Sequence, residues 1–141
     1  MCLYVHGTMH RATKDIVCYK FLALHLKRVD GQIVSNWCSP FQTKCEWNEG
    51  ELKEIPENAY SCVNHGTVSE GYFHSYKDES DARSEGRMWD FWSNLHNYTV
   101  GVFKCVIPKG TLYYEGEHTG CIDGYASQKL MVVELVGTLC A

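Results

Sequence analysis

The 141-residue sequence lacks the features that mark several functional classes. It has no run of basic residues and carries a net charge of −4, which argues against non-specific binding to a nucleic acid backbone. Its longest apolar runs, Phe21–Leu26 and Leu130–Val136, are too short and too interrupted to span a membrane. Residues Met1–His10 lack the basic and continuous apolar segments of a secretion signal. These absences predict a cytoplasmic protein.

The spacing of the cysteines excludes the common zinc motifs. Eight cysteines are present, but none forms a Cys-x-x-Cys pair, and the closest two, Cys38 and Cys45, are seven positions apart. We therefore predict no metal site, and we expect the thiols to be reduced because no secretion signal is present. Cys18 and Cys105 lie inside apolar strand patterns and are predicted to be small core residues.

Motifs of several enzyme classes are also missing. The sequence contains no glycine-rich phosphate loop, no nucleophile elbow and no distinctively placed pair of carboxylates. Its apolar content of 45% is ordinary for a globular protein. The length predicts a single domain, residues 1–141, that is large enough for a core.

The stretch Val102–Gly116 is the most informative part of the sequence. Its first half is apolar and rich in β-branched or aromatic residues, which predicts a buried strand over Thr99–Ile107. Pro108 removes a backbone donor and Gly110 permits a tight turn, after which Thr111–Gly116 resumes an extended, tyrosine-rich pattern. A strand, a turn and an aromatic strand are therefore expected here.

Further patterns predict one long hairpin and one helix. Ile16–Leu26 and Gln32–Trp37 are extended runs joined by Asp30-Gly31, which is a hairpin signal. Asp78–Asn97 is the only convincing helix, although Gly86 weakens its middle. The other segments are predicted as a short strand at Met1–Val5, a loop from Ser39-Pro40-Phe41, a short strand at Cys45–Trp47, a connector at Leu52–Asn58, an extended segment at Tyr72–Tyr76, a polar loop at Gly116–Gly124 and a last strand at Ser127–Leu139.

Together these elements predict an α+β domain, rich in twisted antiparallel or mixed β-sheet, with one main helix. Trp89 is expected in the core of that domain. Trp37 and Trp47 fall where irregular structure is expected, and exposed aromatic residues in such segments often mark a binding surface.

The segments MCLYV, IVCYKFL, SPF, GYFHSY, VFKCVIPKGTLYYEG and YASQKL occur in this order along the chain. Together they resemble a family of small proteins from phages and gut bacteria that has no settled activity. The IPKG-YY-G and YAS-KL pieces are the most specific, and the resemblance covers nearly the whole chain. It implies an accessory protein that works in the cytoplasm of the host cell if a phage encodes it.

A second resemblance rests on His6-Gly7-Thr8, Gly71-Tyr72-Phe73, Ser80-Asp81-Ala82 and Ile107-Pro108-Lys109-Gly110. Their order is similar to that in ADP-ribosyltransferases, with Tyr19-Lys20 as an alternative first match. This resemblance implies a split-sheet arrangement and NAD or a related nucleotide as ligand. It also implies that His6 grips the nicotinamide ribose and that Tyr72 stacks on nicotinamide.

One position departs from the transferase pattern. That family places a catalytic Glu at the start of its last strand, where it favours an oxocarbenium-like transition state electrostatically. The corresponding position here is Ser127, Gln128 or Leu130, and none of these is a carboxylate. The carboxylates that could act instead are Glu115, Glu117 and Glu134. The departure favours binding over catalysis.

The candidate ligand-binding residues are His6, Tyr72, His74, Tyr76, Lys109, Tyr113 and Gln128. Aromatic faces can stack on a base, but alternating aromatic residues in a strand also form a core, and for His74 and Tyr76 the two interpretations are balanced. One of Tyr72 and Phe73 is expected to face the core, and Lys109 is expected in a solvent-exposed turn.

Three functional hypotheses follow. The preferred one is a non-catalytic phage-type accessory protein with a role in counter-defence, which binds a nucleotide-like ligand or a host protein. The second is an active ADP-ribosyltransferase or NAD glycohydrolase, for which NAD would be the substrate. The third is a virion or structural component. The sequence sets neither the ligand, the host target nor the oligomeric state.

Overall fold

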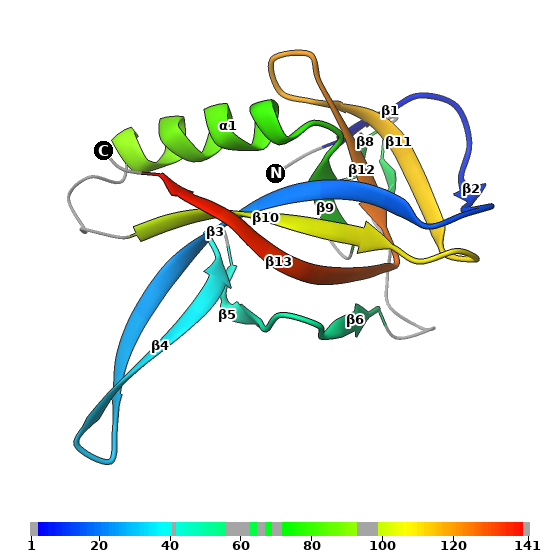
Figure 1. Ribbon diagram of the computed structural model, residues 1–141. Coiled ribbons are helices and arrows are strands. Elements are labelled where there is room, and N and C mark those ends of the chain that lie inside the picture. The colour runs from blue at the N-terminus through cyan, green and yellow to red at the C-terminus, as the bar shows by residue number, and fades with distance from the viewer. Residues whose placement is uncertain are drawn as a thin grey trace.

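The computed structural model describes residues 3–40, 42–55, 63–64, 67–68, 72–92 and 99–139. Within them, one helix, α1 (Glu79–Trp92), accompanies a set of strands (Figure 1). The strands are β1 (Leu3–Val5), β2 (His10–Arg11), β3 (Ile16–Val29), β4 (Gln32–Ser39), β5 (Gln42–Trp47), β6 (Leu52–Glu54), β7 (Val63–Asn64), β8 (Thr67–Val68), β9 (Phe73–Tyr76), β10 (Thr99–Ile107), β11 (Leu112–His118), β12 (Ile122–Ser127) and β13 (Lys129–Leu139).

The described strands form one sheet in two halves, and all their pairings are antiparallel. The first half runs β6-β13-β10-β3, with β4 and β5 beyond β3. The second runs β9-β12-β11-β1-β8-β7, with β2 beside β11. One residue pair, Tyr19 in β3 and Tyr76 in β9, joins the halves. The predicted β-rich α+β class with one helix is therefore confirmed.

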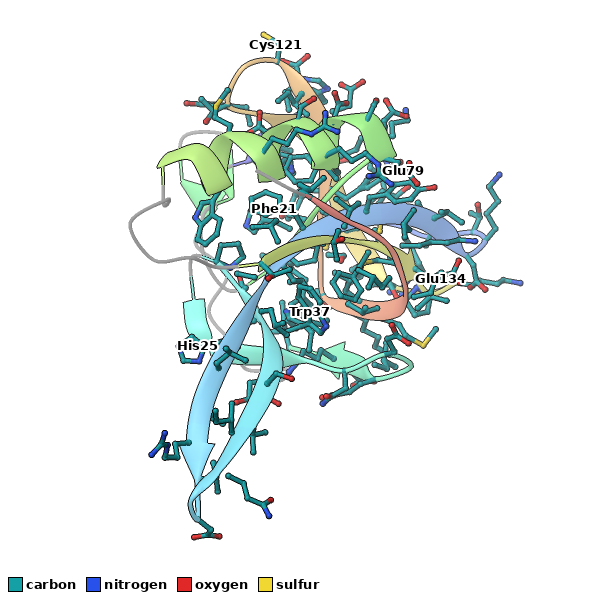
Figure 2. All side chains as sticks on the ribbon, turned by 60° about the vertical axis from the view of Figure 1, so that its left-hand side comes forward. Phe21, His25, Trp37, Glu79, Cys121 and Glu134 are labelled. Carbon is teal, nitrogen blue, oxygen red and sulfur yellow. The ribbon has the colours of Figure 1, made fainter. Side chains whose placement is uncertain are left out.

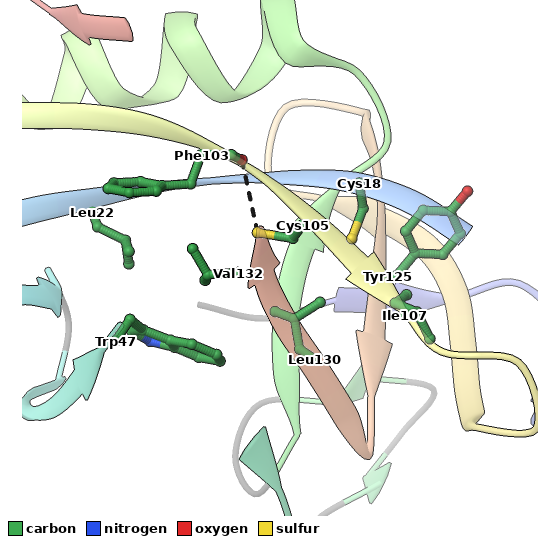
Figure 3. Packing of buried hydrophobic residues seen from close by; sticks show 9 residues of the cluster. All are labelled: Cys18, Leu22, Trp47, Phe103, Cys105, Ile107, Tyr125, Leu130 and Val132. Atoms are coloured by element: carbon green, nitrogen blue, oxygen red, sulfur yellow. Dashed lines mark hydrogen bonds between the residues drawn. The ribbon is translucent and has the colours of Figure 1, made fainter. Parts of the chain in front are cut away.

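The main core lies between the two halves (Figure 3). Its buried members are Cys18, Leu22, Trp47, Phe103, Cys105, Ile107, Tyr125, Leu130 and Val132. Tyr125 in β12 and Leu130 in β13 stand four strand positions apart in the sheet order, about 19 Å in a flat sheet. Because both lie in one core, the sheet must curl. The burial of Cys18 and Cys105 confirms their predicted place in the core.

A second core lies between α1 and the opposite face of β3, β10 and β13. Phe21, Val102 and Leu139 are buried there against Ala82 of the helix. A Cβ atom at Gly86 would come within 2.7 Å of Leu139 Cδ1. The glycine that weakens the helix in isolation is therefore what allows the helix to approach the sheet closely.

The helix begins close to its predicted start. It runs from Glu79 to Trp92, and residues 93–97 of the predicted range lie outside the described residues. The carbonyl of Asp78 accepts a hydrogen bond from Ala82 N at 3.2 Å. Acidic Glu79 and Asp81 occupy the first turn, where negative charge interacts favourably with the helix dipole. Trp89 is half-buried against the second core, as predicted.

The predicted loop at Gly116–Gly124 is wrong. These residues belong to a hairpin of β11 and β12, and only Thr119-Gly120-Cys121 form its turn. A Cβ atom at Gly116 would collide with the carbonyl oxygen of Tyr4, and one at Gly124 with the ring of His118. Two of the three glycines therefore lie in strands, where they leave room for neighbouring atoms, and do not mark a loop.

Two other loop predictions are also wrong. Leu52–Glu54, predicted as part of a connector, forms β6, and 56–58 of that connector lie outside the described residues. Its polar side chains gave no strand signal because an edge strand needs only its backbone to pair with β13. Beyond β4, which includes Ser39, the chain enters β5 at Gln42 rather than a loop, and Phe41 lies outside the described residues.

The predicted exposure of the two tryptophans is corrected as well. Trp47 is buried in the main core, where its ring meets that of Phe73 edge-on at 5.4 Å. Trp37 lies in β4, is half-buried and meets the ring of Phe103 at 5.0 Å. Both residues sit in strands, so their rings pack inward.

No helix among the described residues is long and apolar enough to cross the bilayer.

Candidate functional site

Among the described residues, the longest continuous run of exposed positions is 26–35. It lies in the outer half of the β3–β4 hairpin, residues 24–37, which we call the hairpin arm. It projects away from the remaining strands (Figures 1 and 2). Pairing between β3 and β10 ends at Leu24 and Thr99, whereas pairing between β3 and β4 continues to Val29 and Gln32. Beyond Leu24 the arm is thus a two-stranded ribbon among the described residues.

One face of the arm is mostly apolar. Leu24, Leu26 and Arg28 alternate along β3, opposite Trp37, Ser35 and Ile33 of β4. Leu26 is 62% exposed and Ile33 is 70% exposed. This is the face that carries Leu22 into the main core, so the apolar character of the core continues outward along the arm. Large side chains exposed together in this way commonly mark an interaction surface.

The opposite face of the arm is mostly polar and is bound to the body. Lys27 Nζ lies 2.8 Å from Glu46 Oε1 of β5, and Asn36 Nδ2 lies 3.5 Å from the same atom. The hydrogen bond from Lys27, followed by its positive charge, lowers the pKa of Glu46. These contacts orient the arm relative to β5.

At the base of the arm, the apolar face joins the surface of the body. A Cβ atom at Gly101 would come within 2.9 Å of both Trp37 and Leu135, so both side chains lie over the glycine. Glu49 Oε1 accepts a hydrogen bond from Leu135 N at 3.2 Å. We call Leu135, Trp37, Leu24, Leu26 and Ile33 the apolar stripe. It runs from Glu49 at the base towards Arg28 at the tip.

Three residues predicted from sequence come together elsewhere, on β11 and the segment after β1. His6 Nε2 lies 3.8 Å from Glu117 Oε1, and His6 N donates to Glu115 O at 2.9 Å. Lys77 Nζ lies 3.6 Å from Glu115 Oε1. Burial, and then the charge of Glu115, raises the pKa of the neighbouring Tyr125 to about 12. The group is exposed and acidic.

Three other predicted ligand residues lie inside the protein. The His74 ring is 5.7 Å from that of His118, and the Tyr76 ring is 4.9 Å from the same histidine. Tyr72 meets Tyr114 edge-on at 5.7 Å. His74 and Tyr76 are buried, and burial raises the pKa of Tyr76. These side chains belong to the packed interior, where they have little surface for stacking on a base.

Both Tyr72 and Phe73 pack inward, on opposite faces of the sheet. Tyr72 is buried with Leu3 and Ala126, whereas Phe73 packs against the main core. The prediction that one of them faces the core is met by both, because this part of the sheet is covered on each face.

The remaining candidates are scattered. Lys109 lies in the exposed turn after β10, and its N–H donates to Asp15 Oδ1 at 2.8 Å. Tyr113 is half-buried, with its ring 5.8 Å from that of Tyr125. Gln128 links β12 to β13 and donates from its backbone N–H to Leu112 O at 3.0 Å.

Glu134 stands apart from the other two candidate carboxylates. It is exposed in β13, opposite Lys104 of β10 (Figure 2). In the sheet order, β10, β3, β9 and β12 separate its strand from β11, which carries Glu115 and Glu117. The three carboxylates therefore do not form one group.

The sequence named Lys20 only as part of an alternative first match to the transferase pattern, and its burial was not predicted. Lys20 Nζ donates to His74 O at 2.7 Å and lies 5.7 Å from the centre of the Trp47 ring. Its single charge within an apolar run was the available signal. The contact ties β3 to β9 near the one residue pair that joins the halves of the sheet.

Within the described part of the chain, no three histidine, cysteine, aspartate or glutamate side chains are grouped so that they could hold a metal ion. A comparison with protein-family models finds no matching family. Comparisons with curated proteins and with solved structures also find no match. The geometry is therefore the basis for the function proposed below.

Proposed function

We propose that the protein is a non-catalytic binding protein that acts by contacting another protein through its hairpin arm. The observation that carries this proposal is the exposure of Leu26 and Ile33 on a ribbon that projects from the body. Of the two forms of the binding hypothesis, a nucleotide-like ligand or a host protein, the burial of His74 and Tyr76 favours the protein partner.

The energetics of exposed apolar surface support this choice. Burying a Leu or Ile side chain contributes about 1.5–3 kcal/mol. In the free protein, most of this burial free energy is not gained for Leu26 and Ile33, because both side chains remain exposed. A two-stranded ribbon with an apolar face is also a liability for aggregation, which proteins otherwise limit with charge, proline or short strands. Binding a partner would use the surface and remove the liability.

The two sequence resemblances give the proposal its setting. The likeness to small phage and gut-bacterial proteins suggests an accessory role in the cytoplasm of the host cell, including counter-defence. A sheet in two halves joined by one residue pair is compatible with a degenerate ADP-ribosyltransferase-like scaffold. On that scaffold, the binding surface would be the arm rather than a nucleotide site.

Site-specific photo-crosslinking in producing cells tests this function. A photoreactive phenylalanine analogue at position 33 is expected to give a discrete crosslinked protein. The matched control is position 17, where Val17 is an exposed apolar residue at the body end of β3, the strand that pairs with the strand of Ile33. The crosslink should disappear when Leu26→Ser is added. Equal crosslinking from both positions, or none from position 33, would contradict the proposal.

A second candidate function is NAD hydrolysis or ADP-ribosyl transfer, favoured by the contact of His6 with Glu117 and the adjacent Glu115. Nicotinamide release from NAD by the purified protein tests it. The binding proposal predicts no release. Release that is lost in Glu115→Gln or Glu117→Gln, but retained in the control Glu134→Gln, would establish the enzyme instead.

A further inference from the structure

We propose that the hairpin arm binds a second copy of this chain, with the apolar stripes of the two copies packed antiparallel about a two-fold axis. This inference rests on the proposed function and names the protein that the arm contacts as a second copy of this chain rather than a host protein. The tip of each arm would lie against the base of the other, and each copy would contribute the same surface, as a closed dimer requires.

The shape of the stripe suits such an arrangement. From Trp37 to Ile33 the chain advances four strand residues, about 13 Å. Along this length the stripe changes from half-buried at Trp37 to 70% exposed at Ile33. The tip therefore has the most apolar surface left to cover, and the base offers an apolar platform formed by Trp37 and Leu135 over Gly101. An antiparallel overlay brings these two complementary ends together.

One charged side chain near each end of the stripe favours the same orientation. Arg28 lies at the tip, directly across from Ile33, and Glu49 lies at the base, bound to Leu135 N. In an antiparallel dimer, Arg28 would face Glu49 of the second copy, and the same attraction would occur twice. A parallel overlay would place the two Arg28 side chains together, and like charges at close range repel.

The other face of the arm is already engaged within its own chain. Lys27 and Asn36 bind Glu46 of β5, so that face contributes to holding the arm in place. The apolar face carries the larger exposed side chains, Leu26 and Ile33. The interface therefore falls on the apolar stripe and not on the polar face.

Sedimentation equilibrium over a broad concentration range tests the proposal directly. The wild-type chain of 16.1 kDa should approach twice that mass as its concentration rises. Arg28→Glu should weaken self-association by about tenfold, as should Glu49→Arg, because each places like charges together. The double variant exchanges the positive and the negative side chain of the pair, so association should be restored. The control is Lys14→Glu, which makes the same change in charge as Arg28→Glu but at an exposed site on the body. It should leave association unchanged.

Each alternative outcome has a defined meaning. A wild-type mass that stays monomeric, a dimer unaffected by either charge reversal, or a double variant that does not recover would overturn the inference. A monomer that crosslinks from position 33 to a different protein would retain the proposed function and reject the second copy. A monomer without any such crosslink would reject both. Sedimentation of a monomer with lipid vesicles would identify a membrane occupant and also reject the second copy. Circular dichroism confirms that each variant is folded.

Discussion

The two halves of β3 present the same residue type on the same face in opposite environments. Leu22 is fully buried in the main core, whereas Leu26, four residues further along, is 62% exposed. β10 flanks the strand as far as Leu24, and β4 alone pairs with it beyond that point among the described strands. The comparison teaches that neighbouring strands, rather than local sequence, decide whether an apolar side chain in this protein supports the fold or remains available for binding.

The sharpest way to break this comparison is to truncate both leucines. Leu22→Ala should lower the free energy of unfolding by about 2–5 kcal/mol, because it leaves a cavity in a packed core. Leu26→Ala should change it by no more than about 0.5 kcal/mol, measured at a concentration low enough to keep the chain monomeric. Urea denaturation provides both values. Equal losses would mean that the arm is part of the core.

The sequence predicted the elements that carry strong local signals. β10 was located correctly because its apolar run is continuous, and the long hairpin because Asp30-Gly31 supplies two consecutive positive φ angles. β6 was missed because edge pairing by a polar strand leaves no apolar pattern. β12 was missed because Gly124 provides room for His118, a requirement that appears only in three dimensions.

The candidate site was less predictable because it depends on long-range pairing. His6 and Glu117 were both named from sequence, but their contact needs the register of β1 against β11, across more than one hundred positions. The exposure of Ile33 depends on where β10 ends beside β3. The sequence carried no signal for this exposure, because nothing in it predicted that the first strand of the hairpin pairs with the strand at Thr99–Ile107.

A second prediction concerns close packing in the body. In Gly86→Ala, the new methyl group would crowd Leu139 and Phe21, and overpacking of this kind costs about 1–3 kcal/mol. The better helix propensity of alanine offsets about 1 kcal/mol of that cost. We expect a net loss of stability on thermal denaturation. Ser84→Ala, at an exposed site in the same helix, should be neutral or slightly stabilising.

A third prediction concerns the buried thiols of the body. Burial raises the pKa of Cys18 to about 12, with Ser75 and Lys20 partly opposing the rise, and it also raises the pKa of Cys105. The thiol of an unfolded chain has a pKa of about 8.5. The stability due to the neutral buried thiols is therefore complete below that pH and is lost as the pH rises above it.

Each of these thiols should then remove up to about 1.4 kcal/mol of unfolding free energy per pH unit. Urea denaturation at a series of pH values near 9 measures the slope. Cys18→Ala should make the slope shallower, whereas Cys121→Ala, at an exposed turn, should leave it unchanged. A slope that responds to Cys121 but not to Cys18 would contradict the buried position of Cys18.

The smallest effect is expected at the exposed ion pair of Lys77 and Glu115. Lys77→Met should change the free energy of unfolding by about 0.5 kcal/mol or less, because both groups are solvated and screened by salt. Denaturation at low and high salt measures the change. A large, salt-independent loss would assign this acidic group to the structural body and remove it as a candidate site.

Hydrogen exchange along the β3–β4 hairpin tests the central claim most directly, because one experiment reports on both the buried half of β3 and the arm. At low protein concentration, amides near Leu22 should exchange slowly and those near Leu26 and Ile33 quickly. Raising the concentration should slow exchange in the arm and leave the amides near Leu22 unchanged. If exchange in the arm is the same at both concentrations, or is already as slow as at Leu22 in the dilute protein, the arm is not a surface that a second copy covers.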